Sequence, residues 1–422
     1  MYKQAFTAGS LRFSSKSLRK SFPLKDLDLA IEQAEKATRQ DKFRFGELRT
    51  RYINGKPVFE LTKLSSKVVE RKITDNIRRI YNVRQADRRL ITSQVKALLE
   101  ERVPFGLVRL DISAYFESIK KNNLIDKLDN DLALSFQTRR LIKQLLNKVE
   151  LRNKAGLPRG LSVSTILAEL YLKGFDRYIR SIEGVYYYAR FVDDMIVFTV
   201  NDPNELFSKI ANKLSSMDLM VNQSSDKKVI EWVDCKGCGR RDCRCKGEGR
   251  SENVSVDYLG YKYRFLDVID RGARMRDRVK GGYTRVQVSM ATGKLTRTKT
   301  RLAEALFAYA IGKDYELLLD RVRFLAGNYI VSRPGDVEAL KAGIYFNYPL
   351  INDLECFREL DRIKVSFCYS SRSPLSKFPT GTISRHAARD ICSISFVEAF
   401  LRKTVYSFSS KRLAQIRSCF SI

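Results

Sequence analysis

The stretch Tyr186–Phe198, "YYYARFVDDMIVF", decides the fold because it places two adjacent carboxylates between two runs of apolar and aromatic residues. Two such runs with almost nothing between them predict a β-hairpin with buried strands. The turn of a buried hairpin usually takes Gly or Asn rather than two like charges. Asp193 and Asp194 therefore indicate a functional site at the tip of this hairpin.

A third carboxylate, Asp111, follows a short apolar strand in "FGLVRLDISAYF" and precedes a predicted helix. If this strand lies beside the hairpin in one sheet, Asp111, Asp193 and Asp194 converge. Clustered carboxylates repel one another unless a cation lies among them, and Mg²⁺ prefers oxygen ligands. The sequence therefore predicts a site for two Mg²⁺ ions, which would clamp the attacking hydroxyl and the leaving pyrophosphate of a nucleotide transfer.

The composition points to a polyanionic partner, with 78 Lys and Arg against 48 Asp and Glu and a formal net charge of +30. Nucleic acid is favoured over a membrane surface, because no apolar run approaches the roughly 18 residues of a spanning helix. The single histidine, His386, argues against His-dependent catalysis. The absence of a secretory apolar segment and the use of eight Cys in a long chain favour a reducing cytoplasm.

The chain divides into three predicted parts of an α+β protein. Residues 1–45 form a basic, helical N-terminal extension, and residues 46–270 alternate strands with helices. A polar, cysteine-dense insertion occupies residues 234–253 within this middle part. Residues 271–422 read as a mostly helical C-terminal domain.

The insertion contains four cysteines in the spacing C-x₂-C-x₄-C-x-C. Four thiolates are a complete tetrahedral set for structural Zn²⁺. The ligands would be Cys235, Cys238, Cys243 and Cys245. A reduced basic loop and a disulfide are the alternatives that the sequence leaves open.

Five motifs, in order along the chain, resemble those of the reverse transcriptases. "FVDD" is similar to the Tyr-x-Asp-Asp box, "LVRLDISAYFESI" to the first carboxylate motif and "GLPRGLSVSTILAELYL" to the Gly-x-Pro-x-Gly motif. "YLGY" resembles the primer grip, and "RRIYNVRQADRRLI" resembles the fingers segment that contacts template and triphosphate. The resemblance implies a right-hand polymerase, with fingers and an antiparallel palm followed by a thumb-like helical domain.

The resemblance also implies residue roles in an RNA-templated DNA polymerase that adds dNTPs to a 3′-hydroxyl. Asp111 and Asp193 would be the main Mg²⁺ ligands and Asp194 a weaker one, while the ring of Phe116 would exclude the ribose 2′-hydroxyl. The implied substrate-binding residues are Phe116, Arg78, Arg79, Arg159, Gly160 and Lys227, and the implied primer grip is Tyr258, Leu259, Gly260 and Tyr261. Two features depart from the family: Arg159 replaces the usual Gln, and Lys227 lies further from Asn222 than the family spacing.

The motif style, the inserted loop and the helical C-terminal region are most similar to bacterial abortive-infection and defence-associated reverse transcriptases. Among these, the chain resembles the smaller enzyme of the type-3 system. This implies a noncoding RNA template, a DNA product, a second reverse transcriptase subunit, a higher-order oligomer and a role in antiphage defence.

Three other functions are compatible with parts of the pattern. One is template-independent DNA synthesis primed from a tyrosine of the chain, and another is an inactive RNA-binding scaffold for a partner subunit. The intact acidic set argues against the scaffold, because an unused cluster of like charges would only destabilise the fold. Phe116 disfavours the third, an RNA-dependent RNA polymerase.

Overall fold

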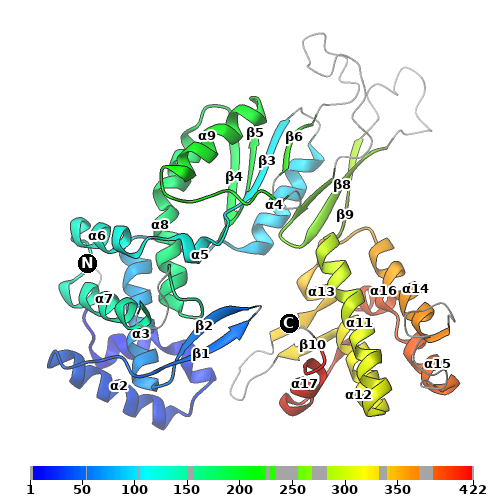
Figure 1. Cartoon of the computed structure of the whole chain (residues 1–422), viewed down its shortest axis with the longest axis horizontal. Coiled ribbons are helices and arrows are strands. Elements are labelled where there is room, and N and C mark those ends of the chain that lie inside the picture. Colours follow the sequence, from blue (N-terminus) through cyan, green and yellow to red (C-terminus); the bar gives the residue numbers. More distant parts are fainter. Residues whose placement is uncertain are drawn as a thin grey trace. The chain divides into compact units, whose positions relative to one another are not determined.

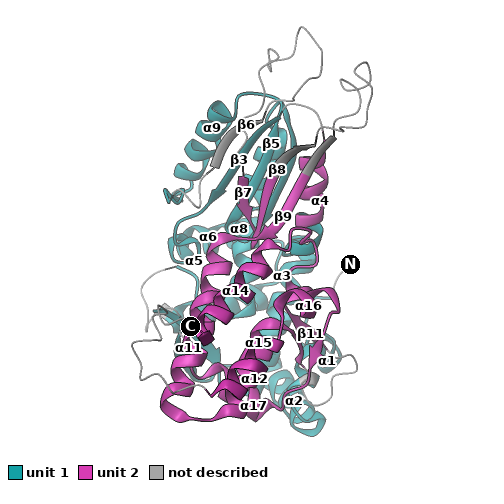
Figure 2. Ribbon diagram, turned by 90° about the vertical axis from the view of Figure 1, so that its right-hand side faces the viewer, with its two compact units in different colours: residues 1–91, 103–235, 333–335 teal, residues 92–102, 236–332, 336–422 magenta. Residues whose placement is uncertain are grey.

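The computed structural model of the chain describes residues 3–53, 55–101, 105–150, 156–224, 229–233, 255–268, 283–331, 340–369 and 384–420. It divides into two units, which Figure 2 distinguishes by colour. The first unit comprises residues 1–91, 103–235 and 333–335, and the second comprises residues 92–102, 236–332 and 336–422.

An antiparallel sheet forms the centre of the first unit, with strand order β4-β5-β3-β6. Its strands are β3 (Phe105–Asp111), β4 (Val185–Phe191), β5 (Asp194–Thr199) and β6 (Val229–Val233). Helix α8 (Ser162–Ser181) packs against β4, and α9 (Pro203–Ser215) packs against β3 and β6 (Figure 1). Every residue of β3 is buried, as expected for an inner strand covered by helices. The predicted hairpin and the predicted strand ending at Asp111 are confirmed as neighbours.

The N-terminal helices of the first unit share its hydrophobic core. They are α1 (Ala8–Ser14), the 3₁₀ helix η1 (Lys16–Lys20) and α2 (Leu24–Arg39), and they pack on α3 (Leu64–Ile80). Phe6, Leu11 and Leu27 belong to the same buried cluster as Val108 of the sheet. Residues 3–39 are therefore an integral part of this unit.

The remaining elements of the first unit connect the helices to the sheet. They are the hairpin strands β1 (Leu48–Ile53) and β2 (Lys56–Leu61), followed by α5 (Tyr115–Ser118), α6 (Lys121–Asp131) and α7 (Phe136–Glu150). Helix α4 (Arg88–Glu100) begins in the first unit and continues into the second. The β1–β2 hairpin was not predicted, although the dipeptide Asn54-Gly55 between two strand-like runs is a strong hairpin signal.

The second unit combines two small sheets with a group of helices. Strands β7 (Ser255–Tyr258), β8 (Tyr261–Val268) and β9 (Tyr283–Met290) form an antiparallel sheet. Strand β10 (Asn328–Val331) pairs antiparallel with β11 (Leu340–Gly343) and parallel with β12 (Val405–Tyr406). The helices are α11 (Thr292–Gly312), α12 (Tyr315–Ala326), α13 (Ile344–Asn347), α14 (Glu355–Tyr369), α15 (Arg385–Ser393), α16 (Phe396–Leu401) and α17 (Ser410–Arg417). The mixture of helices and largely antiparallel strands is of the predicted α+β class.

The described helices also bear on the membrane question. None of them combines the length and the apolar character needed to cross a bilayer.

Candidate active site

The two acidic motifs meet at one end of the four-stranded sheet. Asp111 ends β3 and pairs in the antiparallel register with Asp194, which begins β5. The backbone N–H of Ile112 donates to the carbonyl oxygen of Asp193 at 3.2 Å, which ties the strand end to the hairpin turn. Figure 1 shows β3, β4 and β5 side by side. The structure thus brings together Asp111 from one motif with Asp193 and Asp194 from another, 82 residues further along the sequence.

The turn between β4 and β5 adopts a backbone conformation that its residues do not favour. Val192 and Asp193 form the turn, and Val192 has a φ of 62°. A β-branched residue rarely adopts positive φ, and such a conformation typically costs of order 1–3 kcal/mol. Contacts elsewhere must therefore hold the turn that presents Asp193.

Arg190 of β4 provides such contacts. Its Nη1 donates to the carbonyl oxygen of Val192 at 2.9 Å, and its Nε and Nη2 contact the carboxylates of Asp176 and Glu169 on α8 at 2.7 to 2.8 Å. Burial alone would lower the pKa of Arg190, but hydrogen bonds and charges from Asp176 and Glu169 outweigh it and raise that pKa. The guanidinium therefore stays charged and anchors the hairpin to α8.

Asp194 is held by a different arginine. The Nε and Nη2 atoms of Arg109 donate to the two carboxylate oxygens of Asp194 at 3.2 and 3.1 Å. The two side chains are only 5% and 14% exposed. A two-bond contact between guanidinium and carboxylate is strong and geometrically specific. Arg109 thus engages the charge of Asp194, which fits a supporting role for this carboxylate.

Asn222 fixes the position of Asp111. Its Nδ2 donates to Asp111 Oδ2 at 3.2 Å, and its backbone N–H donates to the Asp111 carbonyl oxygen at 2.8 Å. A β-bridge between Ile112 and Val221 brings the two segments together. Sequence analysis used Asn222 only as the reference for the spacing to Lys227, because its contact with Asp111 depends on the tertiary structure.

The donors at this end of the sheet suit Mg²⁺. This ion is held by one or two protein carboxylates and completes its coordination with water and substrate phosphates. Across the part of the chain that the structure describes, no three His, Cys, Asp or Glu side chains gather as a metal site. Arg109 engages Asp194, and the roles of Asp111 and Asp193 as the main Mg²⁺ ligands stay a prediction.

Two adjacent aromatic residues, four and five positions after Asp111 in the sequence, have different environments. Tyr115 is 1% exposed and its hydroxyl donates to the carbonyl oxygen of Ala168 at 2.6 Å. Burial raises the pKa of Tyr115 well above its ordinary value, so the hydroxyl stays protonated. Phe116 is half-buried, and its ring centre lies 5.1 Å from the guanidinium carbon of Arg159. Tyr115 therefore anchors the segment while Phe116 reaches its surface.

The Gly-x-Pro-x-Gly segment passes too close to other backbone for side chains at its glycines. A Cβ on Gly156 would lie 2.1 Å from the carbonyl oxygen of Phe116, and one on Gly160 would lie 2.5 Å from that of Phe59. Both glycines also have positive φ, at 64° and 93°. The segment is thereby clamped between the start of α5 and strand β2.

Arg159 lies between these two glycines and pairs with Glu117. Its Nε and Nη2 donate to the two carboxylate oxygens at 2.7 and 2.9 Å, and Lys56 Nζ lies 3.8 Å from the same carboxylate. The hydrogen bond from Arg159 holds the pKa of Glu117 below its usual value. The bond to Glu117, with a contribution from the charge of Asp193, raises the pKa of Arg159. A fixed cation thus lies within electrostatic reach of Asp193.

A family model described as reverse transcriptase (RNA-dependent DNA polymerase) matches residues 52–263. The match covers half of the chain. This chain belongs to the reverse transcriptase family. The matched range includes every residue of the acidic end of the sheet and both glycines of the clamped segment.

Two solved structures are similar to parts of this reverse transcriptase. Apo telomerase from Candida tropicalis, truncated from its C-terminal domain, is 14% identical, with a TM-score of 0.35, over 52% of this chain and 53% of that chain. Apo telomerase from the same organism is 13% identical, with a TM-score of 0.33, over 83% of this chain and 55% of that chain. The chain therefore matches only about half the length of either telomerase. No curated protein matches it.

The β1–β2 hairpin carries exposed basic side chains that sequence analysis did not include among the candidate site residues. Arg49, Arg51 and Lys56 are exposed on its strands. The backbone N–H of Phe59 in β2 donates to the carbonyl oxygen of Arg159 at 2.8 Å. This bond attaches the hairpin of the reverse transcriptase to the segment beside Asp193.

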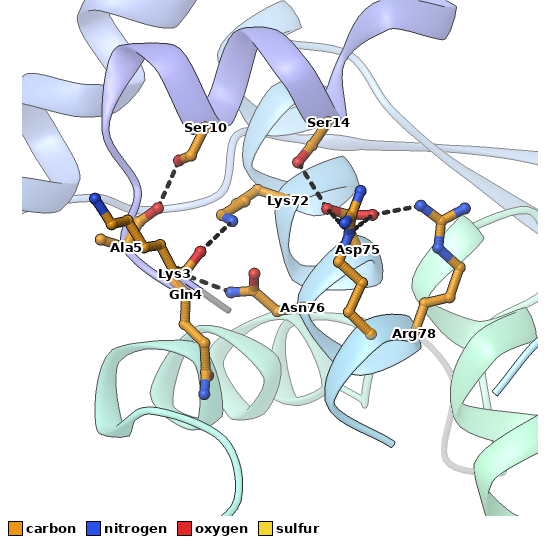
Figure 3. Close-up of polar contacts among 10 residues, drawn as sticks. Lys3, Gln4, Ala5, Ser10, Ser14, Lys72, Asp75, Asn76 and Arg78 are labelled. Carbon is orange, nitrogen blue, oxygen red and sulfur yellow. Dashed lines mark hydrogen bonds and ion pairs between the residues drawn. The ribbon is translucent and has the colours of Figure 1, made fainter. Parts of the chain in front are cut away.

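Arg78 and Arg79, the predicted triphosphate contacts, lie in the last turn of α3. Both pair with the buried carboxylate of Asp75, one turn earlier in the same helix, and Figure 3 shows the contact with Arg78. Glu70, earlier in α3, accepts a hydrogen bond from the backbone N–H of Val163 at 2.8 Å. Val163 follows Gly160 by three residues, so this bond shows which part of α3 lies near the end of the clamped segment. At 1.5 Å per residue, Arg79 lies about 13 Å further along the helix. Their assignment to triphosphate binding stays a prediction.

The predicted primer grip forms the β7–β8 turn in the second unit. Tyr258 and Tyr261 pair across it, and Leu259 and Gly260 occupy the turn with φ of 46° and 85°. Both tyrosines are 1% exposed, so their rings are buried, and the carbonyl oxygen of Gly260 accepts from the backbone N–H of Ala291 at 3.0 Å. The primer-grip role stays a prediction.

Two sets of predicted residues lie outside the described residues. These are Lys227 and the candidate zinc ligands Cys235, Cys238, Cys243 and Cys245. Their predicted roles remain as the sequence indicates them.

Proposed function

We propose that the chain is an active reverse transcriptase whose reaction takes place at Asp111 and Asp193. The observation that carries this proposal is the convergence of the end of β3 with the β4–β5 turn. In the reaction, a primer 3′-oxygen bonds to the α-phosphorus of a dNTP, the bond to the β-phosphate oxygen breaks, and pyrophosphate leaves. Two Mg²⁺ ions bound by the two carboxylates would stabilise the attacking and leaving oxygens.

The residues of the chain have separate tasks in this reaction. Asn222 and the β4–β5 turn hold the two carboxylates, and Phe116 closes the space that a ribose 2′-hydroxyl would need. Arg159, fixed by Glu117, and Lys56 supply positive charge for phosphate oxygens. Because Gly160 has no side chain, strand β2 can lie close to the segment that carries Arg159. Leu259 and Gly260 would support the primer strand.

The test is incorporation of labelled dTTP on a poly(rA)–oligo(dT) template in Mg²⁺ buffer. We expect activity in the wild type and a loss of about 1000-fold or more in Asp193→Asn, since a transition-state charge loses its stabilising partner. Phe116→Ala should admit rNTPs. Unchanged incorporation by Asp193→Asn would refute the assignment of this site, and absence of dNTP incorporation by the wild type would favour the scaffold alternative.

The narrower function rests on the motif resemblance to defence-associated enzymes. We propose that the template is a dedicated noncoding RNA, that a second reverse transcriptase subunit takes part, and that the DNA product serves antiphage defence. Sequencing the nucleic acid that co-purifies with the protein, and plaque counts for cells that carry wild type or Asp193→Asn, test this. Equal plaque counts for both would refute the defence role.

One observation keeps the protein-primed alternative open. Tyr52 is 72% exposed near the tip of the β1–β2 hairpin, which is attached to the segment beside Asp193. Partition of labelled product into the phenol phase, lost in Tyr52→Phe, would establish this alternative in place of synthesis from a nucleic-acid primer.

A further inference from the structure

Glu117, the residue that follows Phe116, fixes the orientation of a single guanidinium. Arg159 Nε and Nη2 donate to its two carboxylate oxygens at 2.7 and 2.9 Å, and the two side chains are 31% and 34% exposed. Two parallel hydrogen bonds define the plane of a guanidinium as well as its position. Arg159 therefore has one defined orientation, although part of its side chain reaches the surface.

The same guanidinium lies against the ring of Phe116. Its carbon is 5.1 Å from the centre of the ring, which is within the range of a cation–π contact. The ring of Tyr115 contacts the ring of Phe116 edge-on, with 5.8 Å between the two centres and 65° between the planes. Phe116 thus packs between a buried ring and a cation that Glu117 holds in place.

The backbone at Phe116 is fixed by the Gly-x-Pro-x-Gly segment. The carbonyl oxygen of Phe116 accepts from the backbone N–H of Leu157 at 2.7 Å. A Cβ on Gly156 would lie 2.1 Å from the same oxygen, so the two segments are in close contact. With the main chain held in this way, rotation about the side-chain bonds of Phe116 decides where its ring lies. The contact with Arg159 restricts that rotation.

A second acid attracts the same guanidinium. The hydrogen bond to Glu117 raises the pKa of Arg159 most, and the charges of Glu117 and Asp193 raise it further, although burial opposes them. If Glu117 lost its charge, Asp193 and the triphosphate of a bound nucleotide would remain to attract Arg159. Glu117 is therefore the acid that keeps the cation against the ring of Phe116.

We propose that Glu117 is a positioning residue for sugar specificity, which fixes Arg159 against Phe116 and so holds the ring where it excludes a ribose 2′-hydroxyl. Arg159 replaces the Gln that is usual in the family, so the arrangement belongs to this chain rather than to the general motif. The pair uses one N–H of Nε and one of Nη2, and the other N–H groups can still donate to phosphate oxygens. The inference rests on the proposed function for the substrate and for the role of Phe116.

The test is the ratio of kcat/KM for dTTP to kcat/KM for ribothymidine triphosphate on poly(rA)–oligo(dT). These two substrates differ only in the 2′-hydroxyl. In Glu117→Gln the ratio should fall about tenfold, because cation–π contacts are worth factors of roughly 2 to 30. The fall should come mainly from a higher kcat/KM for the ribonucleotide, whereas general damage to the fold would lower kcat/KM for both substrates.

Arg159→Lys separates the orientation of the guanidinium from its charge. Lysine keeps the positive charge but loses the planar fork that makes two parallel bonds to a carboxylate. The ratio should therefore fall in Arg159→Lys about as far as in Glu117→Gln. A role limited to phosphate binding predicts instead an unchanged ratio, with the KM of both substrates shifted alike, and that result would overturn the proposal.

Glu205→Gln is the matched control. Glu205 pairs with Lys209 at 2.7 Å on α9, which begins after Thr199, at the end of β5 opposite Asp194. The variant removes the charge of an exposed ion pair in the same unit and should keep the wild-type ratio. An equal fall in Glu205→Gln would overturn the assignment to Glu117.

A double variant tests whether Glu117 acts through the ring. Phe116→Ala/Glu117→Gln should have the same ratio as Phe116→Ala, because no ring remains to be positioned. An unchanged ratio in Glu117→Gln, or an equal fall with and without the Phe116 ring, would overturn the proposal. Failure of the proposed function is a different result, since the wild type would then incorporate no dTTP, whereas failure of this inference leaves dTTP incorporation intact.

Discussion

The tight hairpins β4–β5 and β7–β8 both have a bulky turn residue with an unfavourable positive φ, and different contacts stabilise the two turns. Each has a two-residue turn with a bulky residue at positive φ, 62° for Val192 and 46° for Leu259. The β7–β8 turn adds Gly260 and is flanked by two tyrosines that are 1% exposed. The β4–β5 turn is held by ionic contacts, of which that from Arg190 reaches its carbonyl oxygen directly.

The difference teaches what each kind of contact can do. Apolar burial is non-directional, so buried tyrosines stabilise a hairpin without orienting a polar group at its tip. Paired charges with fixed hydrogen-bond geometry define direction as well as energy. The hairpin that carries the two carboxylates is held by arginines, and the β7–β8 hairpin is flanked by buried aromatic rings.

The largest loss of stability is expected from removing the positive charge of Arg190, which holds the β4–β5 hairpin. Arg190→Met leaves Glu169 and Asp176 without their positively charged partner, although Asp176 keeps a hydrogen bond from the Tyr188 hydroxyl, and should cost about 3–5 kcal/mol of unfolding free energy. Urea denaturation measures it, with Arg177→Met, an exposed site on the same helix α8, expected within about 0.5 kcal/mol of wild type. A loss below 1 kcal/mol in Arg190→Met would contradict the ionic account of this hairpin.

The second prediction distinguishes the role of Asp194 from that of the adjacent Asp193. Asp194→Asn removes the charge that Arg109 pairs with and should cost about 1–3 kcal/mol of stability. Its loss of dNTP incorporation should be far smaller than that of Asp193→Asn, because Asp194 serves the hairpin. Equal activity losses in the two variants would show that Asp194 is a metal ligand of equal weight.

The third effect tests the strained turns. Val192→Gly should stabilise the protein by about 1 kcal/mol, since relief of positive-φ strain exceeds the backbone entropy cost of Gly. Leu259→Gly should gain a similar amount if the strain belongs to the backbone alone. Thermal denaturation measures both. A stability gain in Val192→Gly together with reduced dNTP incorporation would show that the strained turn positions Asp193, and a loss of stability would show that the Val192 side chain matters more than the strain.

The smallest effect is the pH dependence of the first hairpin. Burial raises the pKa of Glu169 above its ordinary value near 4.5. A raised acid pKa contributes stability that is present below 4.5 and is lost as pH rises through the folded pKa. Glu169→Gln keeps an acceptor for Arg190 without titrating, so its stability relative to wild type should increase from pH 4.5 to 7.5. Parallel pH profiles for the two proteins would contradict this.

Short-range patterns predicted much of the active-site scaffold. The alternation and burial signals of the sequence predicted the strand that ends at Asp111, the β4–β5 hairpin and helix α8, because these depend on local hydrophobic pattern and turn chemistry. The same reasoning overlooked β1–β2 despite its Asn-Gly dipeptide. That hairpin was recoverable from the sequence, whereas the close approach of Gly160 to Phe59 was not.

The sequence by itself determined which acids are the candidates for the site, since Asp111, Asp193 and Asp194 stand out as charges at the ends of apolar strands. Only the tertiary structure decided that Arg109 engages Asp194, that Asn222 holds Asp111 and that Arg190 supports the turn of Asp193. The reason is physical: a carboxylate after an apolar strand is a local anomaly visible in one dimension. The identity of its partner depends on strand register and helix packing between segments far apart in the chain.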